Sequence, residues 1–155
     1  MEFFAFNNCT SLTNVVIGNN VTNIGNAVFA HCNSLQGVYF RGNAPVVGSS
    51  EFFADTNAIV YYLPGTTGWS GTFGGLPTML WLPQIQVNDI SFGVQTNQFG
   101  FNYNWASGTI VVVEACTNLT NLGWQPIQTN MLNSSSCYFS DPQWTNYPER
   151  FYRLR

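Results

Sequence analysis

Charged side chains are scarce in this sequence. Only 7% of the 155 residues are charged, whereas about 25% are charged in an ordinary soluble domain. Lysine is absent, and three of the four arginines, Arg150, Arg153 and Arg155, lie together at the C-terminal end. No basic stripe is available to follow a phosphate backbone, so we expect no nucleic-acid partner. Prolines and glycines interrupt the longest uncharged stretch, residues 57–85, so we expect no insertion into a membrane either.

The sequence also lacks the residues from which most catalytic and metal sites are built. His31 is the only histidine, and the four cysteines include no C-x-x-C pair. A zinc site would need four ligands at closer spacing, and nucleophilic catalysis would need His31, which occupies a variable position. The acidic residues form no paired-carboxylate motif: Glu51, Asp55, Asp89, Glu114, Asp141 and Glu149. We expect no cofactor, no metal and no enzymatic activity.

A repeat of 23 residues fills the first part of the chain. The recurring positions predict a core of Phe6, Cys9, Leu12, Val15 and Ile17 in one unit and Phe29, Cys32, Leu35, Val38 and Phe40 in the next. A third, degenerate unit contains Phe52 or Phe53 and then Ile59 to Leu63. One unit cannot bury its own apolar ridge, so the units should stack in register with a parallel β ladder along one face.

Stacking has consequences for both sides of the ladder. Cys9 and Cys32 would lie roughly 5 Å apart along it; a disulfide is conceivable there, but buried free thiols are favoured. On the outer face, Val16 and Tyr39 share a repeat position and are expected to be exposed, which indicates a contact stripe. The residues predicted to make contacts there are Asn14, Val16, Gln36 and Tyr39.

The repeat resembles a known family. Residues 5–17 read A-F-N-N-C-T-S-L-T-N-V-V-I, and residues 20–29 read N-V-T-N-I-G-N-A-V-F. Over residues 3–63 this pattern resembles the BspA type of leucine-rich repeat, with Gly18 where proline is common. The resemblance implies a solenoid in a bacterial-type secreted or cell-surface protein that is used for adhesion or protein contact and has no enzymatic activity.

A solenoid needs a cap over its last apolar rung. Suitable side chains follow the last repeat: Trp69, Phe73, Leu76, Met79, Leu80 and Trp81. The texture then changes to short strands separated by Asn-, Ser- and Thr-rich turns, which predicts a small antiparallel β-sandwich. We therefore expect a mainly β protein, with a leucine-rich-repeat solenoid end and aromatic cap in residues 1–84 and a C-terminal β-sandwich domain in residues 85–155.

The second domain offers two further predictions and a second resemblance. Cys116 and Cys137 fall on separate predicted strands and are either free or joined by a disulfide, which could stabilise by ~3 kcal/mol. Trp144 and Tyr147 are candidates for stacking on a sugar ring, although core packing is the commoner role of such rings. Residues 90–155 resemble a C-terminal module of large secreted proteins of environmental bacteria, a resemblance that implies no particular activity.

Three functions remain open from the sequence. The leading one is a non-catalytic extracellular or cell-surface protein that contacts a protein partner through the β ladder. The second is self-assembly with copies of itself into an extracellular filament, because the chain opens in repeat sequence without a signal peptide and leaves a rung around Glu2–Phe6 open. The third is glycan binding by a carbohydrate-binding module in residues 85–155.

Overall fold

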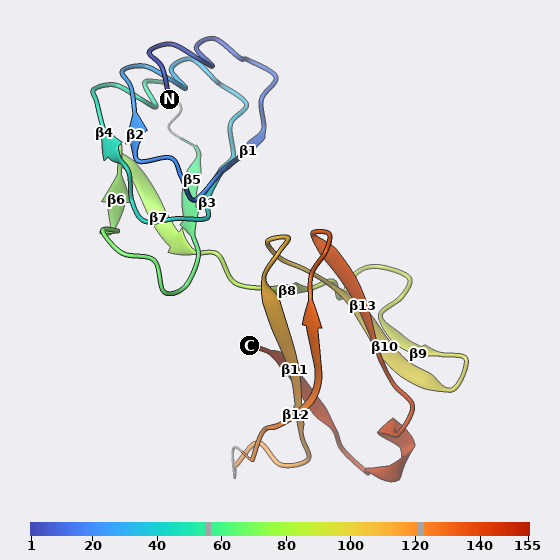
Figure 1. Cartoon of the computed structure of the whole chain (residues 1–155). Coiled ribbons are helices and arrows are strands. Elements are labelled where there is room, and N and C mark those ends of the chain that lie inside the picture. The colour runs from blue at the N-terminus through green and yellow to red at the C-terminus, as the bar shows by residue number, and fades with distance from the viewer. Residues whose placement is uncertain (55–56, 121–122) are drawn as a thin grey trace. The chain divides into compact units, whose positions relative to one another are not determined.

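The computed structural model describes residues 1–54, 57–120 and 123–155. Among these residues, every regular element is a β-strand except one short 3-10 helix, which confirms the mainly β fold class. The chain divides into two compact units, Met1–Leu82 (unit 1) and Pro83–Arg155 (unit 2) (Figure 1). Asp55, one of the acidic candidates, lies outside the described residues.

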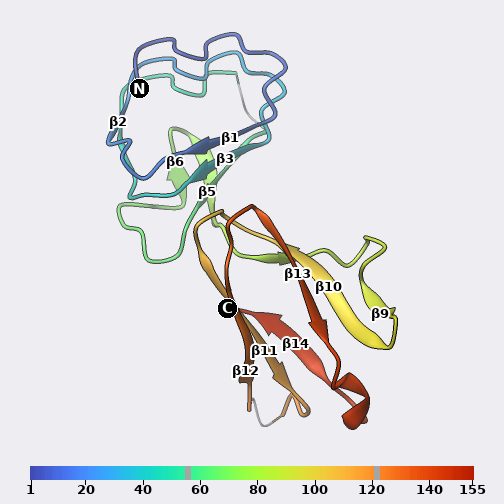
Figure 2. The same ribbon diagram turned by 45° about the vertical axis from the view of Figure 1, so that its right-hand side comes forward.

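Unit 1 contains three stacked coils, each of which adds one strand to a parallel sheet (Figure 2). Val15 of the first coil pairs with Val38 of the second, and Val38 pairs with Val60 of the third. Equivalent apolar residues thus lie beside one another, which is how a regular repeat builds a continuous core. The strands of unit 1 are β1 (Asn14–Ile17), β2 (Asn23–Ile24), β3 (Gly37–Phe40), β4 (Val46–Val47), β5 (Ile59–Tyr62), β6 (Thr72–Phe73) and β7 (Leu76–Leu80).

The phenylalanines of the repeat form a column of stacked rings. The ring centroids of Phe6 and Phe29 are 5.5 Å apart, as are those of Phe29 and Phe52, with interplanar angles of 7° and 2°. The third coil therefore places Phe52 in the column, whereas Phe53 is exposed. The predicted core of the second coil is fully buried: Phe29, Cys32, Leu35, Val38 and Phe40.

The first coil is less buried than we predicted. Phe6 is 38% exposed, whereas Cys9, Leu12 and Val15 are half-buried and pack against the core. Ile17 alone among these positions is buried. The reason is that β1 pairs only with β3 and Phe6 stacks only on Phe29, so this coil has a neighbour on one side.

A short antiparallel pair, β6 and β7, follows the third coil. Trp69 stacks on Tyr62 at 5.1 Å between ring centroids, and Phe73 lies 5.2 Å from Phe40. Phe73 and Leu76 are buried in the same core as the coils. Three predicted cap residues do not close this core: Met79 and Leu80 are exposed on β7, and Trp81 lies against Tyr39. They miss the core because β7 continues the parallel sheet instead of folding across its end.

Unit 2 consists of two antiparallel sheets that share one core. One sheet has the order β13-β10-β8 with β9 on β10, and the other has the order β12-β11-β14. Phe101 and Phe139 of the first sheet pack with Val111 and Val113 of the second. The elements of unit 2 are β8 (Gln84–Ile85), β9 (Gly93–Gln95), β10 (Gln98–Asn104), β11 (Ile110–Cys116), β12 (Gln125–Met131), β13 (Ser136–Asp141), η1 (Trp144–Asn146) and β14 (Phe151–Leu154).

The disulfide considered between Cys116 and Cys137 does not form, and none of the four cysteines is part of a disulfide. Cys116 ends β11 and Cys137 lies in β13, two strands that belong to different sheets. The Sγ atom of Cys137 lies instead 3.7 Å from Nδ2 of Asn130. In unit 1, the buried thiol of Cys32 donates a hydrogen bond to the carbonyl oxygen of Phe6 at 3.1 Å.

Candidate functional site

The outer face of the parallel sheet carries a row of apolar and aromatic side chains. Strand pairing aligns Val16 with Tyr39, Tyr39 with Tyr61, and Tyr61 with Met79. Val16 is 55% exposed and Met79 is 52% exposed, with the half-buried tyrosines between them. We call these four residues, together with Trp81, the ladder face. None of the five carries a charge.

Tyr39 is the centre of the ladder face. Its ring stacks on that of Tyr61 at 4.8 Å between centroids and 9° between planes, and it lies 4.9 Å from the ring of Trp81. The ring also leans back over Gly37, where a Cβ atom would lie 2.6 Å from it. Burial raises the pKa of the Tyr39 hydroxyl, and the neighbouring Tyr61 raises it further. The Tyr39 hydroxyl therefore stays protonated at neutral pH.

The other predicted contact residues lie beside this centre. Asn14 is exposed, and a Cβ atom on Gly37 would lie 2.7 Å from its Oδ1 atom, so Asn14 and Tyr39 meet above that glycine. Gln36 is exposed just before β3, and its backbone bonds the neighbouring coils. The sequence pattern predicts Met79 and Trp81 as cap residues and does not mark Tyr61 as a contact residue. The third repeat could have indicated Tyr61, because it follows Tyr39 by 22 residues in an otherwise recognisable unit.

Residues 1–67 match the family model described as BspA type leucine rich repeat region (6 copies). The leucine-rich-repeat part of the predicted resemblance is thereby confirmed. No curated protein and no solved structure matches the chain. Repeats of this family are generally non-catalytic and commonly take part in protein contact or adhesion at cell surfaces. The resemblance of residues 90–155 to a secreted C-terminal module stays a prediction.

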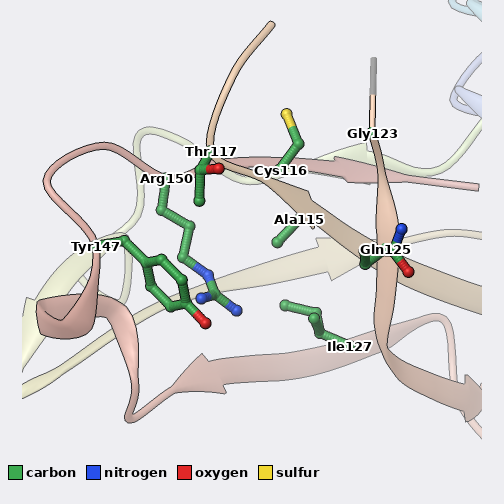
Figure 3. Close-up of a pocket in the computed structure, with 8 residues that line it drawn as sticks. All are labelled: Ala115, Cys116, Thr117, Gly123, Gln125, Ile127, Tyr147 and Arg150. Carbon is green, nitrogen blue, oxygen red and sulfur yellow. The ribbon is translucent and has the colours of Figure 1, made fainter. Parts of the chain in front are cut away.

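Unit 2 contains a separate candidate, a pocket of about 200 Å³ (Figure 3). Figure 3 shows the side chains of Ala115, Ile127, Tyr147 and Arg150 pointing toward one another, whereas Sγ of Cys116 points away. The lining residues come from the end of β11, the start of β12 and the segment around η1: Ala115, Cys116, Thr117, Gly123, Gln125, Ile127, Tyr147 and Arg150. The pocket therefore combines apolar groups with one cation.

A β-bulge places Ile127 in this pocket. Val113 pairs with Gln128, but the next residue, Glu114, pairs with Pro126, so Ile127 is the extra residue of β12. β12 is an edge strand, where proline is tolerated because it need not donate to a neighbouring strand. Bulges of this kind redirect a side chain and are common next to functional sites.

The guanidinium of Arg150 is anchored by Asp141. The Nε atom lies 2.8 Å from Oδ2 of Asp141, an ion pair whose alignment falls short of a hydrogen bond. The same carboxylate accepts hydrogen bonds from the hydroxyl of Tyr152 at 3.0 Å and the backbone N–H of Gln143 at 2.8 Å. Burial raises the pKa of the Tyr152 hydroxyl, and its bond to Asp141 raises it further. The Tyr152 hydroxyl therefore stays protonated and donates to Asp141. The held carboxylate in turn fixes the position of the Arg150 Nε atom.

The two candidates for sugar stacking are not equivalent. Trp144 is half-buried and its indole N–H donates to the carbonyl oxygen of Asn97 at 3.4 Å. Tyr147 is exposed, but the Arg150 guanidinium covers one face of its ring at 4.1 Å. One face of the Tyr147 ring is therefore covered, and Trp144 is partly buried. Sugar stacking by Trp144 and Tyr147 stays a prediction.

No group of three or more His, Cys, Asp or Glu side chains that could hold a metal ion occurs in residues 1–54, 57–120 and 123–155. In the same part of the chain, no helix is long and apolar enough to cross a membrane. His31 lies edge-on against Phe53, with 5.4 Å between ring centroids.

Proposed function

We propose that this protein is a non-catalytic, secreted or cell-surface protein that binds a protein partner through the ladder face of a short solenoid. The observation that carries the proposal is the uncharged row of Val16, Tyr39, Tyr61 and Met79, exposed at both ends. Contiguous exposed apolar side chains mark interaction sites on soluble proteins. Tyrosine and tryptophan are also enriched among the residues that dominate binding energy.

The stacking of these rings supports the proposal further. Ordering a mobile side chain at an interface costs about 0.5–1.5 kcal/mol. Tyr39 is already held between Tyr61, Trp81 and the backbone of Gly37, so much of that cost has been met before the partner arrives. The family match supports the same conclusion, because repeats of this type commonly serve adhesion or protein contact.

The test uses beads coated with the whole chain and a panel of immobilised extracellular proteins. Val16→Asp and Tyr39→Ser should each reduce bead retention on any protein that holds the wild type by tenfold or more, because they interrupt the apolar row. Val46→Asp is the matched control, since Val46 is 71% exposed on β4, outside this sheet. Equal retention of wild type, Val16→Asp and Tyr39→Ser would contradict the proposal, as would no retention on any member of the panel.

Self-assembly is the second candidate, and the exposed phenylalanines of the first coil favour it. Phe3, Phe4 and Phe6 are exposed, and β1 has a strand neighbour on only one side. Unpaired strand edges and open repeat ends bind other chains. Sedimentation velocity across a hundredfold concentration range should then show growing species that Phe3→Glu abolishes. A monomer throughout that range would exclude the filament.

A further inference from the structure

We propose that the pocket of unit 2 binds a carboxylate carried on a small aliphatic group. The site needs three properties for this ligand: a cation that faces the pocket, a lining without acidic residues, and an apolar wall of the right size. The described residues provide all three, and the proposal is independent of the ladder face.

Arg150 supplies the cation. Its side chain is only 10% exposed, and its Nε atom faces Asp141. The guanidinium also bonds the hydroxyl of Tyr152 and lies over the ring of Tyr147, and Figure 3 shows its end directed into the pocket. A carboxylate fits the two parallel N–H groups of a guanidinium.

The surroundings of Arg150 determine on which side an anion can bind. None of the eight residues that line the pocket is acidic. Arg150 also borders a second hollow of about 280 Å³, which Asp141 lines. The Asp141 carboxylate would repel an anion in that hollow, whereas the first pocket reaches the guanidinium with no acidic residue in its lining.

Ala115 and Ile127 supply the apolar wall. The bulge in β12 turns Ile127 toward the pocket, and the ring of Tyr147 lies opposite it (Figure 3). The volume of about 200 Å³ corresponds to about seven water-sized groups at roughly 30 Å³ each. A branched acid of this size can be free in solution or can be the C-terminal residue of a peptide.

The test follows backbone amide signals of the whole ¹⁵N-labelled chain by NMR during titration with three probes. The probes are 3-methylbutanoate, acetyl-Gly-Leu with a free carboxylate, and acetyl-Gly-Leu amide. We expect saturable shifts at Ala115, Cys116 and Ile127 with at least one acid, and at least tenfold weaker binding of the amide. Binding of 3-methylbutanoate alone would identify a free acid as the ligand, and binding of the peptide alone would identify a C-terminus. Equal binding of acid and amide, or no saturable shift with either acid, would overturn the proposal.

Two variants test the position of the site. Ile127→Glu places a carboxylate beside Arg150 within the chain, so it should abolish binding of the added acid. Because Ile127 is 37% exposed, the variant should fold. Ile110→Glu is the matched control, an isoleucine of the neighbouring strand that is 56% exposed and outside the pocket, and it should bind as the wild type does. Unchanged binding by Ile127→Glu would place the site elsewhere and refute the proposal.

Discussion

Replacing phenylalanines of the ring column should measure what a second neighbouring coil contributes to stability. Phe29 is 0% exposed, with Phe6 stacked on one side and Phe52 on the other. Core Phe→Ala substitutions cost about 3–5 kcal/mol, and ring pairs add about 0.5–1.5 kcal/mol each beyond area burial. We therefore expect Phe29→Ala to lower the free energy of unfolding of unit 1 by about 5 kcal/mol.

The same substitution at Phe6 should cost far less. Phe6 is 38% exposed and stacks only on Phe29, so alanine there removes part of a burial term of about 1.5–3 kcal/mol and leaves a notch open to water instead of a closed cavity. We expect a cost of about 1–2 kcal/mol. The two variants should therefore differ by about 3 kcal/mol, although the residues occupy one repeat position.

The assay is a urea titration of the whole chain followed through backbone amide NMR signals of unit 1, because the two units need not unfold together. With a slope of about 1.5 kcal/mol per molar urea, the two midpoints should lie about 2 M apart. If Phe29→Ala is already unfolded without urea, its cost is at least as large as expected. Equal midpoints, or a lower midpoint for Phe6→Ala, would refute the view that stability grows with each stacked neighbour.

Three other substitutions test single contacts. Asp141→Asn should destabilise unit 2 by about 3 kcal/mol in a urea titration, because it leaves a buried arginine without its charge partner; a change below about 1 kcal/mol would show that this pair is not structurally important. The hydrogen bond from Arg153 lowers the pKa of Glu114, and Arg155 lowers it further. The stability that ionised Glu114 contributes is therefore present above the unfolded pKa of about 4.3 and is lost as pH falls through the lower folded pKa. Glu114→Gln should therefore flatten the loss of melting temperature below about pH 4.3, and an unchanged acid profile would contradict that reading. Gly37→Ala should displace the Tyr39 ring, because the added Cβ atom would lie 2.6 Å from it. The near-ultraviolet circular dichroism of the tyrosine stack should therefore decrease. Gly18→Ala is the control and should leave that signal unchanged, because a Cβ atom there has nothing within 4 Å.

The register of the ladder could be predicted from the sequence because the repeat is strict where the strands pair. Val15 and Val38 recur at the same position and lie side by side. The third coil was ambiguous because it is degenerate: Phe52 and Phe53 are equally apolar, and only the stacked ring column selects Phe52. The partial exposure of Phe6 could not be predicted from periodicity, because periodicity describes what a coil shares with its neighbours and not how many neighbours it has.

The pocket of unit 2 left almost no signal in the sequence. Its shape depends on the bulge at Ile127, and a bulge is a property of two paired strands, not of either strand alone. Glu114 shows the same limit. The alternation of a strand places the Glu114 side chain on the sheet face opposite to that of the buried Val113. Glu114 is nevertheless buried as well, because Arg153 and Arg155, about 40 residues further along the chain, bond its carboxylate.

The few charges of the chain are used very differently in the two units. In unit 2, Arg150, Arg153 and Arg155 pair with the carboxylates of Asp141 and Glu114, and Arg150 also borders the pocket. The ladder face of unit 1 contains none. Long-range electrostatic attraction sets association rates and is screened by salt, and the ladder face has no charge of its own through which it could act. The contact proposed there would rest on apolar surface and on rings that are already in place, a mode of binding that suits adhesion to an abundant surface partner better than fast capture of a dilute one.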